Sequence, residues 1–424
     1  MHGSSSSAKR QANSDQLEER PPKALKIHPF FERHQISNDS FKWLESLGAE
    51  RSCLHGINLE PAKMQQKIAA FDLDGTLIKY TSTGEEWSWW TPTIPVKLKE
   101  VHDAGHSIVI VSNQAINSLA LKKWKQKLAL IAAALPDVPF RLYAAIAKDR
   151  YRKPMPGIWY ELEHAAYMDG IEIDKTASFF VGDAAGRQFS SAKRDFASTD
   201  RKWALNIGIK FYTPEEYFLQ HPAHQNIVLP GFHVSSLPDV PFFTPTSKPL
   251  LPLSSGQEVV LFVGYPCVGK TTLFHRIFKP AGYMHVNQDN LKTRTKCVNA
   301  VRDFLHGGLS CVVDNTNRDR ATRKVYIDLA REFNIIIRCF IFSGSIELAW
   351  HNNLYRAFNL PPSSAETEPA RKLLPYSAFT SFSGNYEEPH EDEGYSEIKR
   401  INWVFNGTDE ERRRWSMWLQ IDGK

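Results

Sequence analysis

The feature that most constrains the fold of this chain is a glycine-rich loop directly after an apolar run. Residues 258–263 are Glu-Val-Val-Leu-Phe-Val, and residues 264–271 are Gly-Tyr-Pro-Cys-Val-Gly-Lys-Thr. An amphipathic segment follows, so the loop joins a predicted buried strand to a predicted helix. This spacing is typical of a P-loop, whose backbone amides bind phosphate oxygens at the start of a helix. A strand, phosphate loop and helix in this order predict an α/β domain with a parallel sheet.

Two side chains of the loop carry its predicted chemistry. The Lys270 ammonium would reach the β- and γ-phosphate oxygens of a nucleotide, and the Thr271 hydroxyl would bind Mg²⁺. We therefore expect the loop to bind ATP. The predicted ATP-binding residues of the loop are Gly264, Tyr265, Pro266, Cys267, Val268, Gly269, Lys270 and Thr271.

Two residues downstream of the loop are candidates for the same site. Asp289 follows a short predicted strand and could accept the proton of an acceptor hydroxyl, as phosphoryl transfer requires. A helix cap is the alternative interpretation of Asp289. Arg356 lies in a predicted helix and could bind phosphate as a lid arginine, with a solvated surface arginine as the alternative.

A second constraining feature lies in the first half of the chain. The apolar run Ile-Ala-Ala-Phe at 68–71 is followed by Asp72, Leu, Asp74, Gly75 and Thr. Side chains alternate along a strand, so the two carboxylates point the same way. Such a pair requires a cation, and Mg²⁺ with oxygen ligands is the usual one. One carboxylate could attack phosphorus while the other transfers protons, whereas a solvated turn is the alternative.

Polar residues also follow the next three predicted strands. Ser112 comes after an apolar run at 107–111, Lys153 lies beyond the strand at 140–147, and Asp183 follows the strand at 177–181. A strand, a polar residue at its end and a helix recur in this order. This repeat predicts a domain whose ligands lie at the carboxyl ends of parallel strands. Ser112 and Lys153 would hold phosphate oxygens, and Asp183 would complete the Mg²⁺ site. Taken singly, Ser112 could be a helix cap, Lys153 an exposed charge and Asp183 a turn residue.

Length and composition set the expected domain organisation. A chain of 424 residues is long for one core, and its net charge of +5 permits a polyanionic partner. Five widely spaced cysteines without a Cys-x-x-Cys pair predict reduced thiols, and no apolar run is long enough for a membrane span. We expect a disordered basic tail at 1–40, a first domain at 41–229, a Pro-rich connection at 230–256 and a second domain at 257–424.

The order of motifs in the first domain resembles that of haloacid-dehalogenase-type phosphatases. The matching residues are Asp72, Asp74, Ser112, Lys153 and Asp183. The resemblance implies that Asp72 is the nucleophile and Asp74 the acid/base. The short separations between the motifs leave no room for a cap domain. The predicted fold class is therefore α/β, with two doubly wound domains: a capless haloacid-dehalogenase-like phosphatase followed by a P-loop, adenylate-kinase-like kinase.

The two domains in this order resemble the polynucleotide kinase 3′-phosphatase family. The stretches that carry this resemblance are Tyr151–Pro154, Gly182–Arg187, Phe211–Glu215, His285–Asp289, Asp314–Asn317 and His351–Asn353. It implies removal of 3′-phosphates and ATP-dependent phosphorylation of 5′-hydroxyls at DNA strand breaks. Asp289 would then be the kinase base, Arg356 a lid residue, and Mg²⁺ and ATP the cofactors.

The same resemblance implies the partners and the location. We expect DNA ends as the substrate, with Arg187, Arg294 and Arg323 as contacts to the nucleic acid, and other repair proteins as partners. A monomer in the nucleus is expected, and the basic pairs of the tail are candidate import signals, with a solvated tail as the alternative interpretation. A kinase/phosphatase of a small metabolite is the alternative function. A non-catalytic repair scaffold ranks last, because all the motif residues are present.

Overall fold

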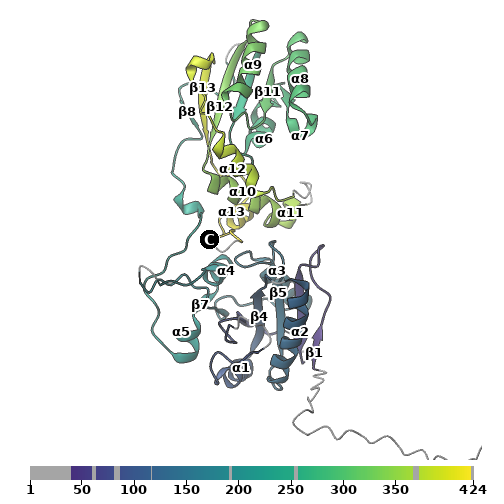
Figure 1. Ribbon diagram of the computed structural model, residues 1–424, viewed down its shortest axis with the longest axis vertical. Helices are drawn as coiled ribbons and strands as arrows, with labels where there is room; N and C mark the ends of the chain where they lie inside the picture. The colour runs from purple at the N-terminus through teal and green to yellow at the C-terminus, as the bar shows by residue number, and fades with distance from the viewer. Residues whose placement is uncertain are drawn as a thin grey trace, which may run out of the picture. The chain divides into compact units, whose positions relative to one another are not determined.

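The computed structural model of the chain contains two separate β-sheets, each with helices packed against it (Figure 1). It describes residues 40–59, 64–80, 86–115, 117–190, 193–252, 256–365 and 372–421. The predicted basic tail lies outside the described residues, except for its last residue. Both sheets are mostly parallel, which confirms the predicted fold class of two α/β units.

The first sheet has seven strands in the order β1-β2-β5-β4-β3-β6-β7. Its strands are β1 (Phe41–Trp43), β2 (Cys53–Asn58), β3 (Lys67–Phe71), β4 (His106–Asn113), β5 (Phe140–Ala145), β6 (Phe179–Val181) and β7 (Lys210–Tyr212). Strands β3 to β7 run parallel, whereas β1 and β2 extend one edge antiparallel. The strand that carries Asp72 and Asp74 at its end is therefore central, between β4 and β6.

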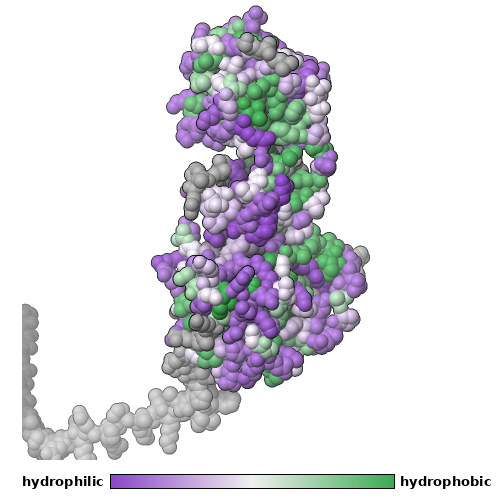
Figure 2. All heavy atoms as spheres, turned by 180° about the vertical axis from the view of Figure 1, so that it is seen from behind, coloured by the Kyte–Doolittle hydropathy of each residue, from purple (hydrophilic) through white to green (hydrophobic). Residues whose placement is uncertain are grey.

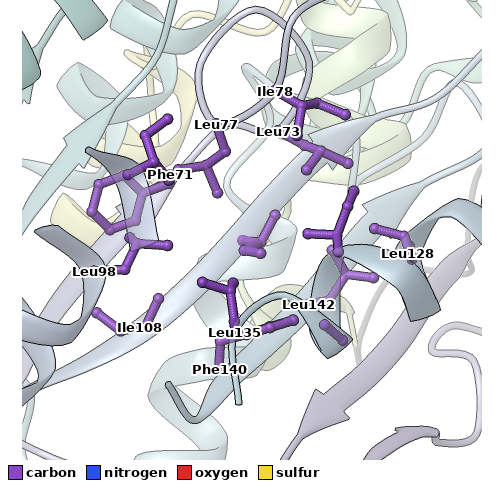
Figure 3. Close-up of a cluster of buried hydrophobic side chains, with 14 of the residues drawn as sticks. Phe71, Leu73, Leu77, Ile78, Leu98, Ile108, Leu128, Leu135, Phe140 and Leu142 are labelled. Carbon is purple, nitrogen blue, oxygen red and sulfur yellow. The ribbon is translucent and has the colours of Figure 1, made fainter. Parts of the chain in front are cut away.

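The helices of this unit cover both faces of the sheet. They are α1 (Ile94–Asp103), α2 (Ser118–Ala133), α3 (Gly157–Met168), α4 (Thr199–Ile207) and α5 (Pro214–Leu219). Alternate residues of β3 face opposite sides: Phe71 packs with residues of α1 and α2, and Ile68 packs with residues of α3 and α4. Figure 3 shows the first of these two cores. Burial on both faces explains the continuous apolar runs 68–71 in β3 and 108–111 in β4.

The second sheet has six strands in the order β10-β11-β9-β12-β13-β8. Its strands are β8 (Phe243–Thr244), β9 (Glu258–Val263), β10 (Met284–Val286), β11 (Cys311–Asp314), β12 (Ile336–Ser343) and β13 (Glu397–Asn402). All pair in parallel except β8, which pairs antiparallel with β13. Since β8 belongs to the Pro-rich stretch 230–256, that stretch contributes an edge strand to this sheet.

The remaining helices surround the second sheet or lie in its connections. They are η2 (Val234–Ser236), α6 (Lys270–Leu273), the π-helix η3 (Phe274–Phe278), α7 (Gln288–Leu291), α8 (Arg294–His306), α9 (Arg320–Glu332), α10 (Ile346–Phe358), α11 (Pro362–Ala365), α12 (Tyr376–Gly384), η4 (Glu391–Glu393) and α13 (Asp409–Trp415). α13 begins with a capping box, because the Thr408 hydroxyl accepts from Glu411 N and the Glu411 carboxylate accepts from Thr408 N. The apolar residues Ile401, Trp403 and Phe405 alternate in the sequence and would predict one strand, but β13 ends at Asn402.

The surface is mixed in character. Hydrophilic residues and smaller hydrophobic patches share the face seen in Figure 2. Phe196 and Tyr80 are among the described apolar side chains that are largely exposed. None of the described helices combines the length and the apolar composition needed to cross a bilayer.

Candidate active sites

The predicted nucleophile pair lies at the carboxyl end of β3. The Asp72 N–H donates to Val181 O of β6 over 2.8 Å, so the chain is still paired where the carboxylate begins. Gly75 then turns the chain with φ = 88°. A Cβ at this position would lie 2.3 Å from Asp183 Oδ2, so a side chain would collide with the carboxylate that follows the neighbouring strand β6. Glycine therefore allows the loop after β3 to pass closely against Asp183.

Lys153 links two carboxylates in the interior of this site. Its ammonium lies 2.7 Å from Asp72 Oδ1 and 2.8 Å from Asp200 Oδ1, and it donates to Val111 O over 2.9 Å. The side chain is only 2% exposed. Burial alone would lower the pKa of Lys153, but Asp200 and Asp72 together raise it above its ordinary value. The lysine is therefore a fixed positive charge beside the candidate nucleophile.

The loop that presents Lys153 is held by a side chain from β4. Asn113 Oδ1 accepts from Lys153 N over 2.9 Å, and Asn113 Nδ2 donates to Lys153 O over 3.0 Å. Both backbone groups of the lysine are thus fixed by one amide. The neighbouring Ser112, 1% exposed, accepts from the side-chain amide of Gln114 over 2.9 Å. The structure therefore brings Ser112 and Lys153 to the same edge of the sheet as Asp72.

Asp200 is a site residue that the sequence did not reveal. It lies in the first turn of α4, and its Oδ2 accepts from Ala184 N over 3.1 Å. A Cβ on Gly182 would approach that oxygen to 2.4 Å, so the glycine makes room for the carboxylate. A helix-starting aspartate is common at the surface, and nothing in its sequence position indicates that this helix points at the site.

Three carboxylates of this site could hold a metal ion. One oxygen each of Asp72, Asp183 and Asp200 lies within 4.8 Å of the others. Burial raises the pKa of Asp72 well above its ordinary value, although Lys153 opposes this shift. Burial and then Asp200 raise the pKa of Asp183 to about 7. Such crowding is relieved by a divalent cation, and an all-oxygen donor set suits Mg²⁺, so these residues fit the predicted ion.

Asp74 is not part of this carboxylate cluster, although the sequence predicted it as a metal ligand. Its Oδ2 accepts from Gln114 Nε2 over 2.8 Å, and its Oδ1 lies 3.6 Å from the ammonium of Lys127. The carboxylate is therefore turned toward β4 and α2. This orientation is compatible with the acid/base role predicted for Asp74.

The ATP loop has the predicted form in the second domain. β9 ends at Val263, and α6 begins at Lys270 after Gly269, which has φ = 87°. The Lys270 ammonium donates to the backbone carbonyls of Gly264 and Tyr265. Burial lowers the pKa of Lys270 to about 8, with Asp314 opposing the shift. Carbonyl groups thus hold the ammonium at the place where a P-loop lysine meets phosphate oxygens.

A carboxylate from the neighbouring strand completes this loop. Thr271 Oγ1 donates to Asp314 Oδ2 over 2.6 Å, and His285 Nε2 lies 3.0 Å from the same oxygen. Burial alone would raise the pKa of Asp314, but His285, Lys270 and Thr271 together lower it. An ionised carboxylate beside a threonine hydroxyl suits Mg²⁺, so Thr271 and Asp314 would hold the ion. The stretch Asp314–Asn317 carries part of the family resemblance, but this role of Asp314 is not predicted from the sequence.

The candidate base and the candidate lid arginine line the same cavity, of about 1240 Å³, as the P-loop. The N-cap of α7 is Asn287, whose side chain accepts from Asp289 N over 2.8 Å. Asp289 therefore lies inside the first turn, so the capping interpretation of Asp289 is wrong. Arg356 comes from α10 and lines the cavity, as does Lys372.

The three arginines predicted to contact nucleic acid differ in their surroundings. Arg323 is fully buried and forms two bonds of 2.9 and 2.7 Å to Glu393. Arg187 is 7% exposed and pairs with two carboxylates, those of Asp195 and Glu215. Neither guanidinium is presented to a ligand at the surface, so both predicted contacts are corrected here to structural ion pairs. Arg294 is exposed at the start of α8, so it stays a predicted contact to nucleic acid.

Comparison with known proteins agrees with this division into two sites. Residues 67–218 match the family model "Polynucleotide kinase 3 phosphatase", and residues 259–371 match the model "AAA domain". Over 372 residues the chain is 37% identical to a "Bifunctional polynucleotide phosphatase/kinase" of Schizosaccharomyces pombe, covering 84% of each chain. The chain belongs to the bifunctional polynucleotide phosphatase/kinase family.

Further relatives share one or both parts of the family's architecture. A "Putative bifunctional polynucleotide phosphatase/kinase" of Acanthamoeba polyphaga mimivirus is 31% identical over 88% of this chain and 93% of its own length. A "Polynucleotide 3′-phosphatase ZDP" of Arabidopsis thaliana is 37% identical over 36% of this chain and 24% of its own length. As a member of the family, the chain is an enzyme with a phosphatase domain and a kinase domain.

Proposed function

We propose that this enzyme removes 3′-phosphates from DNA ends and phosphorylates 5′-hydroxyl ends with ATP, so that broken strands become substrates for ligation. The observation that carries this proposal is that one chain has a carboxylate cluster at one sheet and a cavity lined by P-loop residues at the other. The relatives named for polynucleotide substrates support the choice of nucleic acid over a small metabolite.

In the phosphatase site, one oxygen of the Asp72 carboxylate attacks the phosphorus of the 3′-phosphate. The bond from phosphorus to O3′ breaks, and Asp74 gives a proton to the departing oxygen. Water then attacks the aspartyl-phosphate, Asp74 takes the proton back, and inorganic phosphate leaves. Lys153 and the Ser112 hydroxyl would hold the non-bridging oxygens. Mg²⁺ held by Asp72, Asp183 and Asp200 would supply further charge neutralisation when bound.

In the kinase site, the backbone of residues 264–271 and the Lys270 ammonium would hold the phosphates of ATP. The oxygen of the 5′-hydroxyl attacks the γ-phosphorus while Asp289 takes the hydroxyl proton. The bond between the γ-phosphorus and the oxygen of the β-phosphate breaks. Arg356 would balance charge that develops on the transferred group. Mg²⁺ held by Thr271 and Asp314 would neutralise phosphate charge when bound.

Exposed cations beside the kinase cavity support a polynucleotide acceptor. Lys292, Arg294 and Lys296 are all exposed at the start of α8 or just before it. Each cation that contacts a phosphate releases counterions, so binding should weaken as salt rises. We extend the proposal to a monomeric enzyme in the nucleus that works beside other repair proteins. The basic residues near the start of the chain support this location.

The test compares a 3′-phosphorylated oligonucleotide with a 3′-mononucleotide in a salt series. We expect a higher kcat/KM for the oligonucleotide at low salt, and the advantage should shrink as salt increases because flanking phosphates contribute less. Equal values at low salt would contradict the polynucleotide assignment and favour the small-metabolite alternative. The matching kinase assay transfers labelled phosphate from ATP to a 5′-hydroxyl oligonucleotide.

A further inference from the structure

A buried lysine of α2 faces the acid/base of the phosphatase site. Lys127 lies on the core-facing side of the helix, next to Leu128 and one turn after Trp124, and it is only 7% exposed. Lysine side chains are almost never buried unless they are paired. Its ammonium lies 3.6 Å from Asp74 Oδ1, so Asp74 is the carboxylate that justifies its burial.

Asp74 is held from two sides by different groups. The Gln114 amide donates to Asp74 Oδ2 over 2.8 Å and to Ser112 Oγ over 2.9 Å, which fixes one edge of the carboxylate against β4. Lys127 lies near the other oxygen at a distance beyond an ordinary hydrogen bond. Oδ1 is therefore oriented by charge and keeps its capacity to exchange a proton with substrate.

We propose that Lys127 is a positioning residue that, with Gln114, holds the Asp74 carboxylate in the orientation needed to protonate the departing O3′. The proposal rests on the proposed phosphatase function. Lys127 does not contact substrate in this scheme. In the first step it acts when the electron pair of the breaking P–O bond moves to O3′ and Asp74 supplies the proton, so its contribution to that step depends on how much the leaving oxygen needs the proton. The second step, in which Asp74 takes a proton from water, is the same for every substrate.

This dependence provides a specific test. An alkoxide such as O3′ leaves poorly without a proton, whereas the phenolate of p-nitrophenyl phosphate is stable and leaves without one. Loss of a group that positions Asp74 should therefore slow the first step, measured as release of the leaving group in a single turnover, for the 3′-phosphorylated oligonucleotide and have far less effect on that step for p-nitrophenyl phosphate. A group that merely maintains the fold would slow both reactions equally.

The variants are Lys127→Met, which keeps the length and packing of the side chain, and Lys127→Arg, which keeps the charge. For Lys127→Met we expect the single-turnover rate of 3′-hydroxyl release from the oligonucleotide to fall about tenfold or more, with KM nearly unchanged. Release of p-nitrophenolate in a single turnover should lose much less, and Lys127→Arg should recover part of the lost rate. Asp74→Asn is the positive reference and should show the same difference between substrates.

The control variant is Lys122→Ala, which removes an exposed lysine of the same helix and should change neither reaction. Equal losses on both substrates in Lys127→Met, no loss on either, or a rise in KM alone would each overturn the proposal. If the unaltered enzyme hydrolyses p-nitrophenyl phosphate but not the oligonucleotide, the proposed substrate is wrong. A simple alkyl phosphate then replaces the oligonucleotide, and the same comparison decides the role of Lys127.

Discussion

The two active sites of this enzyme hold their lysines in opposite ways. In the phosphatase domain, Lys153 lies between the carboxylates of Asp72 and Asp200, which raise its pKa. In the kinase domain, the Lys270 ammonium is held by two backbone carbonyls, and burial lowers its pKa to about 8. Both lysines lie at the carboxyl ends of parallel strands, so the fold does not cause the difference.

The difference follows from where the reacting group comes from. In the proposed mechanism the phosphatase supplies its own nucleophile, Asp72, so the charges around this carboxylate are arranged between side chains before substrate arrives. In the proposed kinase reaction, ATP brings both the phosphoryl group and most of the negative charge. Its lysine is therefore left without a close carboxylate partner, and the nucleotide completes the charge balance. The phosphatase site should thus be sensitive to loss of any one carboxylate, and the kinase site to the charge state of Lys270.

The largest expected effect is that of Asp72→Asn. The amide keeps the shape of the side chain but is a far poorer nucleophile, so phosphatase activity should fall by roughly 10⁴-fold or more. Phosphorylation of 5′-hydroxyl ends should be unchanged, because Asp72 belongs to the other sheet. Both activities are measured on one preparation. Substantial remaining phosphatase activity would favour direct attack by water. The phosphatase would then not supply its own nucleophile, and this difference from the kinase would be lost.

The converse substitution is Lys270→Met. Loss of the ammonium removes a cation from the β- and γ-phosphates, so kinase activity should fall by roughly 10²- to 10³-fold. Release of phosphate from a 3′-phosphorylated oligonucleotide should remain as in the unaltered enzyme. A parallel fall in phosphatase activity, in a variant with an unchanged melting temperature, would show that the two sites are coupled.

Asp200→Asn tests the side-chain pairing of the phosphatase site. The substitution removes one of the two carboxylates beside Lys153 and one member of the acidic cluster. We expect phosphatase activity to fall by about 10- to 100-fold and the Mg²⁺ concentration for half-maximal activity to rise. Asp137→Asn, at an exposed position of the same domain, is the control. An unchanged Mg²⁺ requirement would exclude Asp200 from the metal site.

The smallest effect concerns the pH dependence of ATP binding. Below pH 8 Lys270 is charged with and without ATP, so affinity should be nearly constant. Above pH 8 the free enzyme must take up a proton on binding, so affinity should fall by up to about tenfold per pH unit. Calorimetric titration between pH 6.5 and pH 9.5 measures this change. In Lys270→Arg the side chain stays charged over the whole pH range. The affinity for ATP should therefore be weaker than in the unaltered enzyme but independent of pH.

The amino-acid sequence predicts the central strands better than the edges of the first sheet. β3 and β4 each contain a continuous apolar run of four residues because both of their faces are covered. β1 has three residues, and His55 and Gly56 interrupt the pattern of β2, so neither strand gives a clear signal. Tertiary pairing, which local patterns do not contain, places them at the edge.

The same limit applies to the sites. Residues at strand ends, such as Asp72 and Asp183, could be predicted because parallel strands end at one edge of a sheet. Asp200 and Lys127 lie on helices, and their roles depend on which strand end each helix faces. The burial of Arg323 depends on Glu393, which lies 70 residues later in the chain. The sequence pattern of the helix alone therefore predicts that Arg323 is exposed.

The position of β3 between β4 and β6 has a consequence for how each site forms during folding. The phosphate loop of the kinase is one continuous segment, residues 264–271, and needs only its own strand and helix start. The phosphatase site joins residues from Asp72 to Asp200, and β6 and α4 must dock before the acidic cluster exists. Closing such a long segment is slow compared with forming a local loop. A growing chain therefore carries Asp72 long before it carries the acidic cluster, and the complete cluster exists only after β6 and α4 have docked.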